Sequence, residues 1–217
     1  MKTSQSISQS IRRGLSRKVL CLSLLSAASL GAMTSAYGYD GVETYTAGRH
    51  FFKRVVTDTI VHTTRNPNWS QIPFAITSVT LQPGQRALVN VGYSAETRCV
   101  SQNAAPEWCE LRIMVGGVEA NPAASGTATP FAFDSTGNGN ETLGSWEGHA
   151  VHRHICLYNN TTAVKVYPVS VQWQVTNFGV NPVEFWVDDT ALTVEMAQGC
   201  TLNNQVPGDP EELQQNR

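Results

Sequence analysis

The chain has 217 residues, of which 41% are hydrophobic and 15% are charged, and its formal charge is −2. This length suits one domain of ordinary size, and the apolar fraction is too high for an intrinsically disordered chain. The lack of a net positive charge excludes a general nucleic-acid binder, which needs a basic surface.

Residues 1–36 have the features of an export signal that is removed from the mature protein. Arg12 and Arg13 belong to a basic segment, and an apolar run and then small residues follow it. We expect cleavage after Ala36, with Gly38 as the alternative position. The two arginines also partly match a twin-arginine signal, so the export route stays open.

Without this leader, ten Lys and Arg stand against seventeen Asp and Glu, which gives a formal charge of −7. No later segment approaches the roughly 18 continuous apolar residues of a transmembrane helix. We therefore expect a secreted or periplasmic protein with no stable membrane insertion and no nucleic-acid partner.

The mature chain keeps four cysteines, and an even number behind an export signal predicts two disulfides. We favour the pairs Cys99–Cys109 and Cys156–Cys200 among the three pairings that four cysteines allow. The first pair would close a short loop between adjacent strands. The second would tie the end of the last strand to the sheet.

Period-two alternation of apolar and polar residues runs through most of the mature chain, and no helical pattern competes with it. The predicted strand-rich runs are residues 53–64, 74–81, 85–96, 109–115, 131–133, 143–158, 169–176 and 183–196. Pro and Gly in residues 82–85 and the pair Gly116–Gly117 are turn signals.

This pattern predicts an all-β domain over residues 37–200, followed by a polar tail at 201–217. We expect an antiparallel β-sandwich of jelly-roll type with about eight or nine strands.

Four segments have strand and turn patterns that resemble those of known proteins: residues 78–93, 111–122, 169–175 and 185–195. Together they resemble uncharacterised bacterial exported proteins that are built as jelly-roll sandwiches. Those proteins are similar in turn to carbohydrate-binding modules and tumour-necrosis-factor-like domains. The resemblance implies the fold only, because a sandwich supports many unrelated sites and no catalytic residues transfer from it.

A partial calcium-loop pattern lies at the predicted hairpin tip after residue 133. Asp134, Thr136 and Asn138 supply oxygen ligands at positions one, three and five, and Gly139 stands at position six. Position twelve, which usually carries a bidentate acid, is Ser145. The alternative interpretation is a hairpin tip in which these residues only provide turn geometry.

Two histidines form a second partial metal pattern. His152 and His154 point to the same face of a strand and could reach one ion, whereas His149 points to the other face. A third ligand would have to come from another strand. The alternative is a polar outer face of a half-buried strand.

Two of the five tryptophans are candidates for ligand binding. Trp69 and Trp108 lie in polar loops, where an exposed ring offers a flat apolar surface to a sugar or a protein. The alternative is that they close an end of the sandwich. Trp173 and Trp186 are expected in the core because they alternate with apolar residues.

The adjacent carboxylates Asp188 and Asp189 point to opposite faces of a strand, so they do not form a catalytic pair by themselves. A hydrolase would need a second acid across a cleft, such as Glu147 or Glu184. We favour a structural role for the two aspartates, as a bulge or as a side-chain bond to a loop.

No nucleophile motif or phosphate-binding glycine loop is present. The sequence thus favours a secreted β-sandwich without catalytic activity that acts by binding or as a structural component, with a glycan or a protein as its partner. A glycan-binding module with a structural calcium ion is the first alternative, and a glycan-acting hydrolase is the second.

Overall fold

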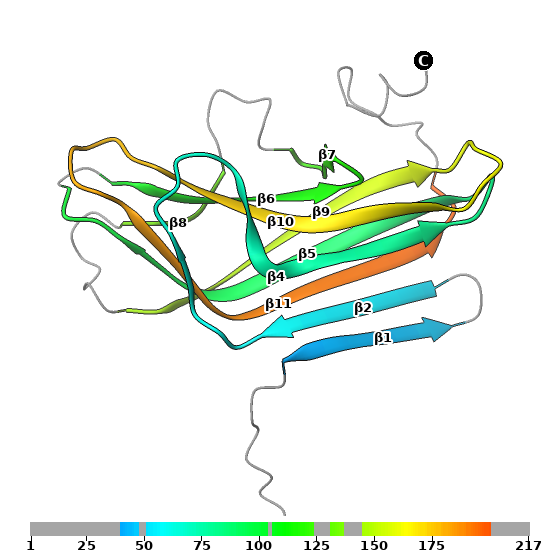
Figure 1. Ribbon diagram of the computed structural model, residues 1–217, viewed down its shortest axis with the longest axis horizontal. Coiled ribbons are helices and arrows are strands. Elements are labelled where there is room, and N and C mark those ends of the chain that lie inside the picture. Colours follow the sequence, from blue (N-terminus) through cyan, green and yellow to red (C-terminus); the bar gives the residue numbers. More distant parts are fainter. Residues whose placement is uncertain (1–39, 48–50, 104–105, 124–130, 137–144, 201–217) are drawn as a thin grey trace, which may run out of the picture. The chain divides into compact units, whose positions relative to one another are not determined.

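The computed structural model describes residues 40–47, 51–103, 106–123, 131–136 and 145–200. The predicted leader and the predicted tail lie outside these residues. Every regular element in the described part is a β-strand, and all strand pairs are antiparallel (Figure 1). The expectation of an antiparallel β-sandwich is confirmed.

The first sheet has six strands and contains the longest ones. Its order is β1 (Gly41–Ala47), β2 (Phe51–Asp58), β11 (Glu184–Gln198), β5 (Arg86–Val100) and β9 (Glu147–Tyr158), and β3 (His62–Thr64) also pairs with β11.

The second sheet has five strands and forms the other layer in Figure 1. Its order is β4 (Ser70–Leu81), β10 (Lys165–Thr176), β6 (Trp108–Val115) and β7 (Val118–Glu119), and β8 (Ala132–Ser135) pairs with β6. The described residues thus form eleven strands instead of the expected eight or nine. The predicted run 53–64 is divided into β2 and β3, no predicted run covers β1, and β7 is too short to show alternation.

The core lies between the two sheets and follows from the period-two pattern. In β5, every second residue from Ala87 to Tyr93 is buried, and in β10 the buried series runs from Tyr167 to Val175. Burying one such large apolar side chain contributes roughly 1.5–3 kcal/mol. The ring of Trp173 lies 5.8 Å from that of Phe185, which confirms the predicted core position of this tryptophan.

Two predicted turns are confirmed at their glycines. Gly84 has a φ of 70°, and the amide of Gln85 donates to the carbonyl of Gln82 at 3.0 Å. Gly116 and Gly117 have φ values of 61° and 88° between β6 and β7. Side chains disfavour this left-handed region, so glycine permits both reversals.

A β-bulge interrupts β11 at the two aspartates. The register against β5 shifts between Asp188 and Ala191, and Asp189 has a φ of 43°. The Asp188 carboxylate accepts a hydrogen bond from the amide of Asp189 at 2.9 Å. Asp188 is half-buried and Asp189 is exposed. The bulge that the sequence favoured is therefore present.

The bulge changes which residues of β11 face the core. Phe185 and Val187 are buried before it, whereas Leu192 and Val194 are buried after it. One extra residue reverses the alternation. Trp186 therefore lies on the outer face and is only half-buried, so its predicted core position is wrong.

The structure contains both favoured disulfides. Cys99 bonds to Cys109, and Cys156 bonds to Cys200, with Cα atoms 5.9 Å apart in each pair. The first links β5 of one sheet to β6 of the other. The second ties the end of β11 to β9, which lies two strands away in the same sheet.

The two disulfides should differ in their contribution to stability. The Cys156–Cys200 bond spans 44 residues and the Cys99–Cys109 bond spans 10. The chain-entropy argument predicts losses of about 4 and about 3 kcal/mol when each pair is replaced by alanine. Denaturant unfolding of the two double variants measures this difference, and the reverse ranking would contradict it.

Candidate functional site

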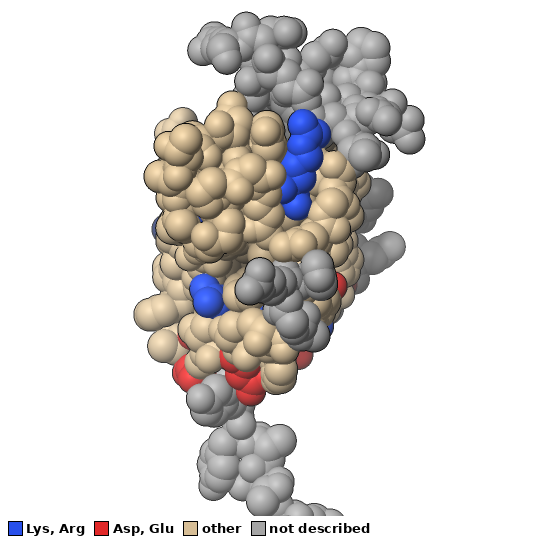
Figure 2. Space-filling view, turned by 90° about the vertical axis from the view of Figure 1, so that its right-hand side faces the viewer, with Lys and Arg blue, Asp and Glu red and all other residues tan. Residues whose placement is uncertain are grey.

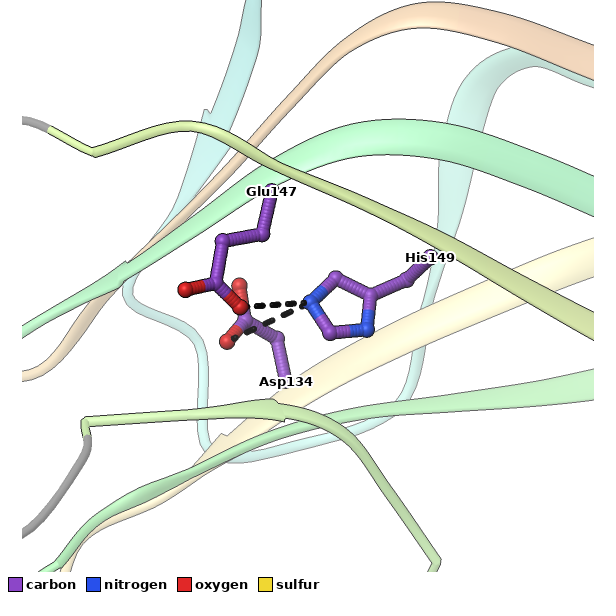
Figure 3. Close-up of side chains that lie close together, drawn as sticks. All are labelled: Asp134, Glu147 and His149. Atoms are coloured by element: carbon purple, nitrogen blue, oxygen red, sulfur yellow. Dashed lines mark ion pairs between the residues drawn. The ribbon is translucent and has the colours of Figure 1, made fainter.

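A cluster of one histidine and two carboxylates lies between the sheets at the end where β8 and β9 meet (Figure 3). Asp134 comes from β8 of the second sheet, and Glu147 and His149 come from β9 of the first. Residues two apart on a strand share a face, so the side chains of Glu147 and His149 project together toward Asp134.

The three side chains approach each other closely. His149 Nε2 lies 3.4 Å from Glu147 Oε2 and 3.9 Å from Asp134 Oδ1. One donor atom from each residue lies within 4.8 Å of the other two. The exposed fraction is 6% for the Asp134 side chain, 29% for His149 and 45% for Glu147, so the cluster opens to solvent on the Glu147 side.

The carboxylate of Asp134 is held by other contacts. Thr97 Oγ1 donates to Asp134 Oδ2 at 2.6 Å, and the Ser135 amide donates to Oδ1 at 2.6 Å. The Phe133 ring lies 5.6 Å from the imidazole of His149. These neighbours fix the orientation of the aspartate and limit the movement of the histidine.

Two of the three predicted calcium ligands, Asp134 and Thr136, lie in the described residues. Asp134 points into the cluster with His149, whereas Thr136 Oγ1 accepts a hydrogen bond from the Glu107 amide at 2.8 Å. Asn138 lies outside the described residues. The calcium loop of Asp134, Thr136 and Asn138 stays a prediction.

The predicted pair of histidines is arranged as expected but gains no third ligand in the described part of the chain. His152 and His154 are exposed on the outer face of β9, and His149 lies on the inner face. The His152 ring lies over Gly92, where an added Cβ would come within 2.9 Å of it.

Trp69 and Trp108 lie at the same end of the second sheet. Trp69 directly precedes β4, and Trp108 is the first residue of β6 rather than a loop residue. The starts of both strands are aligned with the last residues of β10. The guanidinium of Arg112 lies 4.5 Å from the ring centre of Trp69. The ring of Trp108 makes an edge contact with Phe178 at 5.2 Å. Both tryptophans are half-buried, so each has part of its surface already covered by a neighbour.

The acids that a hydrolase would use with the aspartates of β11 have other neighbours. Glu184 accepts a hydrogen bond from Arg65 Nε at 3.1 Å, and Glu147 lies beside His149. Asp188 is aligned with Glu96 of β5, but the two residues stand on neighbouring strands of one sheet rather than across a cleft.

A groove of about 320 Å³ runs over the outer face of the first sheet. Small residues on three adjacent strands form its floor. The sequence alone did not predict that these residues meet. They are Gly92, Ser94, Ala150 and Ala191. The cross-strand register aligns Ser94 with both Ala150 and Ala191, so the hollow arises where three small residues meet in one row.

Polar groups surround this floor. Asn90, His152 and Thr193 line the groove, and Lys53 Nζ pairs with Glu195 Oε1 at 2.9 Å along it. These side chains offer both hydrogen-bond donors and acceptors.

Two tryptophans and an arginine stack farther along the same face. The guanidinium of Arg98 lies 5.0 Å from the ring centre of Trp146 and 4.4 Å from that of Trp186. Ser94 and Arg98 both point outward from β5, so the groove and this aromatic cluster share one face. Trp146 is 36% exposed.

Charge is dispersed on the part of the surface that Figure 2 shows. Lys and Arg form separate patches, acidic side chains gather at the lower end, and uncharged residues cover most of the view. Among the described residues in this view, Lys and Arg form no continuous stripe.

No protein-family model matches the chain, and no curated protein has a significantly similar sequence. The part of the chain that the structure describes contains no helix with the length and apolar character needed to cross a membrane. The function is therefore inferred from the residues of the site.

A buried tyrosine lies behind the groove, in the core. The hydroxyl of Tyr93 makes no hydrogen bond of normal geometry within the described residues. Burial raises the pKa of Tyr93 above its usual range; the nearby Thr190 hydroxyl opposes this shift, and the charge of Asp58 adds to it.

The stability of the protein should therefore fall when the pH rises above about 10, where an exposed tyrosine in the unfolded chain ionises while native Tyr93 stays neutral. Tyr93→Phe should make this fall shallower and change the free energy of unfolding at pH 7 by less than about 1 kcal/mol. Denaturant unfolding between neutral and alkaline pH measures both effects.

The control is Tyr158→Phe, which alters a tyrosine that is 43% exposed. It should keep the alkaline fall of the wild-type protein. Parallel pH profiles for Tyr93→Phe and the wild type would contradict the prediction.

Proposed function

We propose that this protein is an exported β-sandwich without catalytic activity, and that it binds a glycan in the groove on the outer face of the first sheet. The observation that carries this proposal is the groove itself, with its floor of small residues and its polar rim. It replaces the loop tryptophans as the favoured glycan surface.

The chemistry of the groove suits a sugar. Sugar hydroxyls donate and accept hydrogen bonds, and Asn90, His152 and the Lys53–Glu195 pair supply both kinds of partner. The ring of Trp146 offers an apolar surface on the same face, which suits the C–H face of a sugar ring. A ligand that runs along β5 would meet both features.

The disulfides support an extracytoplasmic location. Two bonds of this kind fit an oxidising compartment. Together with the leader expected in residues 1–36, they support secretion or export to the periplasm. The net charge expected for the mature chain supports a partner other than a nucleic acid.

We also infer a jelly-roll topology. The first sheet contains β2, β11, β5 and β9, and the facing sheet contains β4, β10 and β6. The chain therefore alternates between the sheets, and β2 lies beside the last strand. Both features support this topology over a simple meander.

Filling the groove tests the proposal. Ala150 is exposed on the groove floor, so Ala150→Phe should block the ligand without disturbing the core. The purified protein is first screened on an array of glycans, and calorimetry then measures the affinity for the best ligand. We expect binding by the wild type and a loss of about tenfold or more in the variant, which is about 1.4 kcal/mol.

Thr80→Phe is the matched control, because Thr80 is exposed on β4 of the other sheet. It should bind like the wild type. Trp69→Ala and Trp108→Ala test the earlier loop hypothesis in the same assay. Loss of glycan binding in these two variants, with full binding by Ala150→Phe, would contradict the assignment of the binding site to the groove. If the wild-type protein binds no glycan on the array, the glycan hypothesis is contradicted, and a protein partner or a structural role is favoured.

A further inference from the structure

We propose that Asp134, Glu147 and His149 bind a zinc ion that links the two sheets. This inference is independent of the glycan groove, since the cluster faces the interior of the sandwich and the groove lies on its outer surface.

The ligand types select the metal. Calcium and magnesium take oxygen ligands, whereas zinc accepts imidazole nitrogen together with carboxylate oxygen. A set of one histidine and two carboxylates thus favours zinc over the calcium expected from Asp134, Thr136 and Asn138. Three protein ligands leave a fourth zinc position for water, on the side where Glu147 opens to solvent.

The spacing of the ligand atoms fits a bound ion. Zinc bonds of about 2.0–2.1 Å at a tetrahedral angle separate two ligand atoms by about 3.3–3.4 Å. His149 Nε2 lies 3.4 Å from Glu147 Oε2 and 3.9 Å from Asp134 Oδ1. A movement of a few tenths of an ångström would bring the second pair to this separation, and the ligand atoms of Asp134 and Glu147 lie within 4.8 Å of each other.

The competing explanation is a protonated His149 that forms direct ion pairs with the two acids. Charge-assisted hydrogen bonds of this kind have lengths of about 2.7–2.9 Å. Both observed distances are longer, and the buried Nε2 atom makes no hydrogen bond within the described part of the chain. Among the described residues this nitrogen makes two long ion-pair contacts and no hydrogen bond, a spacing that suits an ion shared by the three side chains.

The surroundings of Asp134 favour the same conclusion. Its carboxylate is fixed by the Thr97 hydroxyl and the Ser135 amide before any ion binds. Neighbours that hold a ligand in position raise metal affinity. Because Asp134 comes from β8 and His149 from β9, the bound ion would join one sheet to the other.

The purified protein, with both disulfides intact, is first treated with a chelator. It is then titrated with zinc alone, and calorimetry measures the binding. Cobalt provides a second readout through its visible absorption spectrum. We expect one ion per chain, a spectrum typical of a site with one nitrogen and several oxygens, and a higher thermal midpoint with zinc. His149→Gln should weaken binding by about a hundredfold or more, at least as much as the loss of a supporting neighbour.

His152→Gln is the matched control, because His152 lies on the same strand but is exposed on its other face. It should bind zinc like the wild type. Circular dichroism checks the fold of each variant. If His149→Gln does not fold, Glu147→Gln provides the test at a position whose side chain is 45% exposed.

Three results would overturn the proposal. The first is the absence of stoichiometric zinc binding by the wild-type protein. The second is loss of binding in His152→Gln together with full binding in His149→Gln or Glu147→Gln, which would move the site to the outer face. The third is a preference for calcium that His149→Gln leaves unchanged, which would favour the predicted calcium loop.

Discussion

The burial of two facing sets of apolar side chains between the sheets is the constraint on which the rest of the molecule depends. Long strands such as β5 and β10 keep every second residue apolar over most of their length. Because the inner positions are committed to this packing, only the outer faces and the ends of the sandwich are free to carry polar groups.

Polar contacts join the two layers near both sides of the sandwich. Arg54 of β2 reaches across to β4 and donates to Thr77 Oγ1 at 3.2 Å. On the other side, Asn121 and His154 exchange two backbone hydrogen bonds of 2.8 and 2.9 Å. These contacts join the two layers at both sides.

The histidine–carboxylate cluster occupies the end at which β8 and β9 lie close together (Figure 1). His149 has the same inward parity as Val151 and Ile155, but it stands near the start of β9, where the core gives way to solvent. Thr97 and Asp134 have similar positions on their own strands. Thr97 and Asp134 are buried and hydrogen-bonded to each other, whereas His149 keeps access to water beside Glu147. Each inward polar group at this end therefore has a partner or solvent.

The outer surface of the first sheet is determined by the bulge and by a row of small residues. The bulge at Asp188 and Asp189 transfers Trp186 from the expected core to this surface, where Arg98 stacks on it. Beyond the bulge, the small residues of three strands align and leave a hollow. One inserted residue therefore changes the composition of a whole face without changing the sheet order.

The sequence by itself determined the all-β class, most of the long strand runs, the turns at Gly84 and Gly116, the paired cysteines and the opposite faces of His149 and His152. These features are local or follow from a period of two, so alternation and residue type are sufficient to find them. The strand register, the change of face at the bulge and the contacts between the sheets are not local, because they depend on residues far apart in the sequence. Asp134 and His149 belong to different sheets, and Gly92, Ala150 and Ala191 belong to three strands. Only the tertiary structure decided which of these residues meet, because a shift of one residue in pairing moves every side chain to the opposite face.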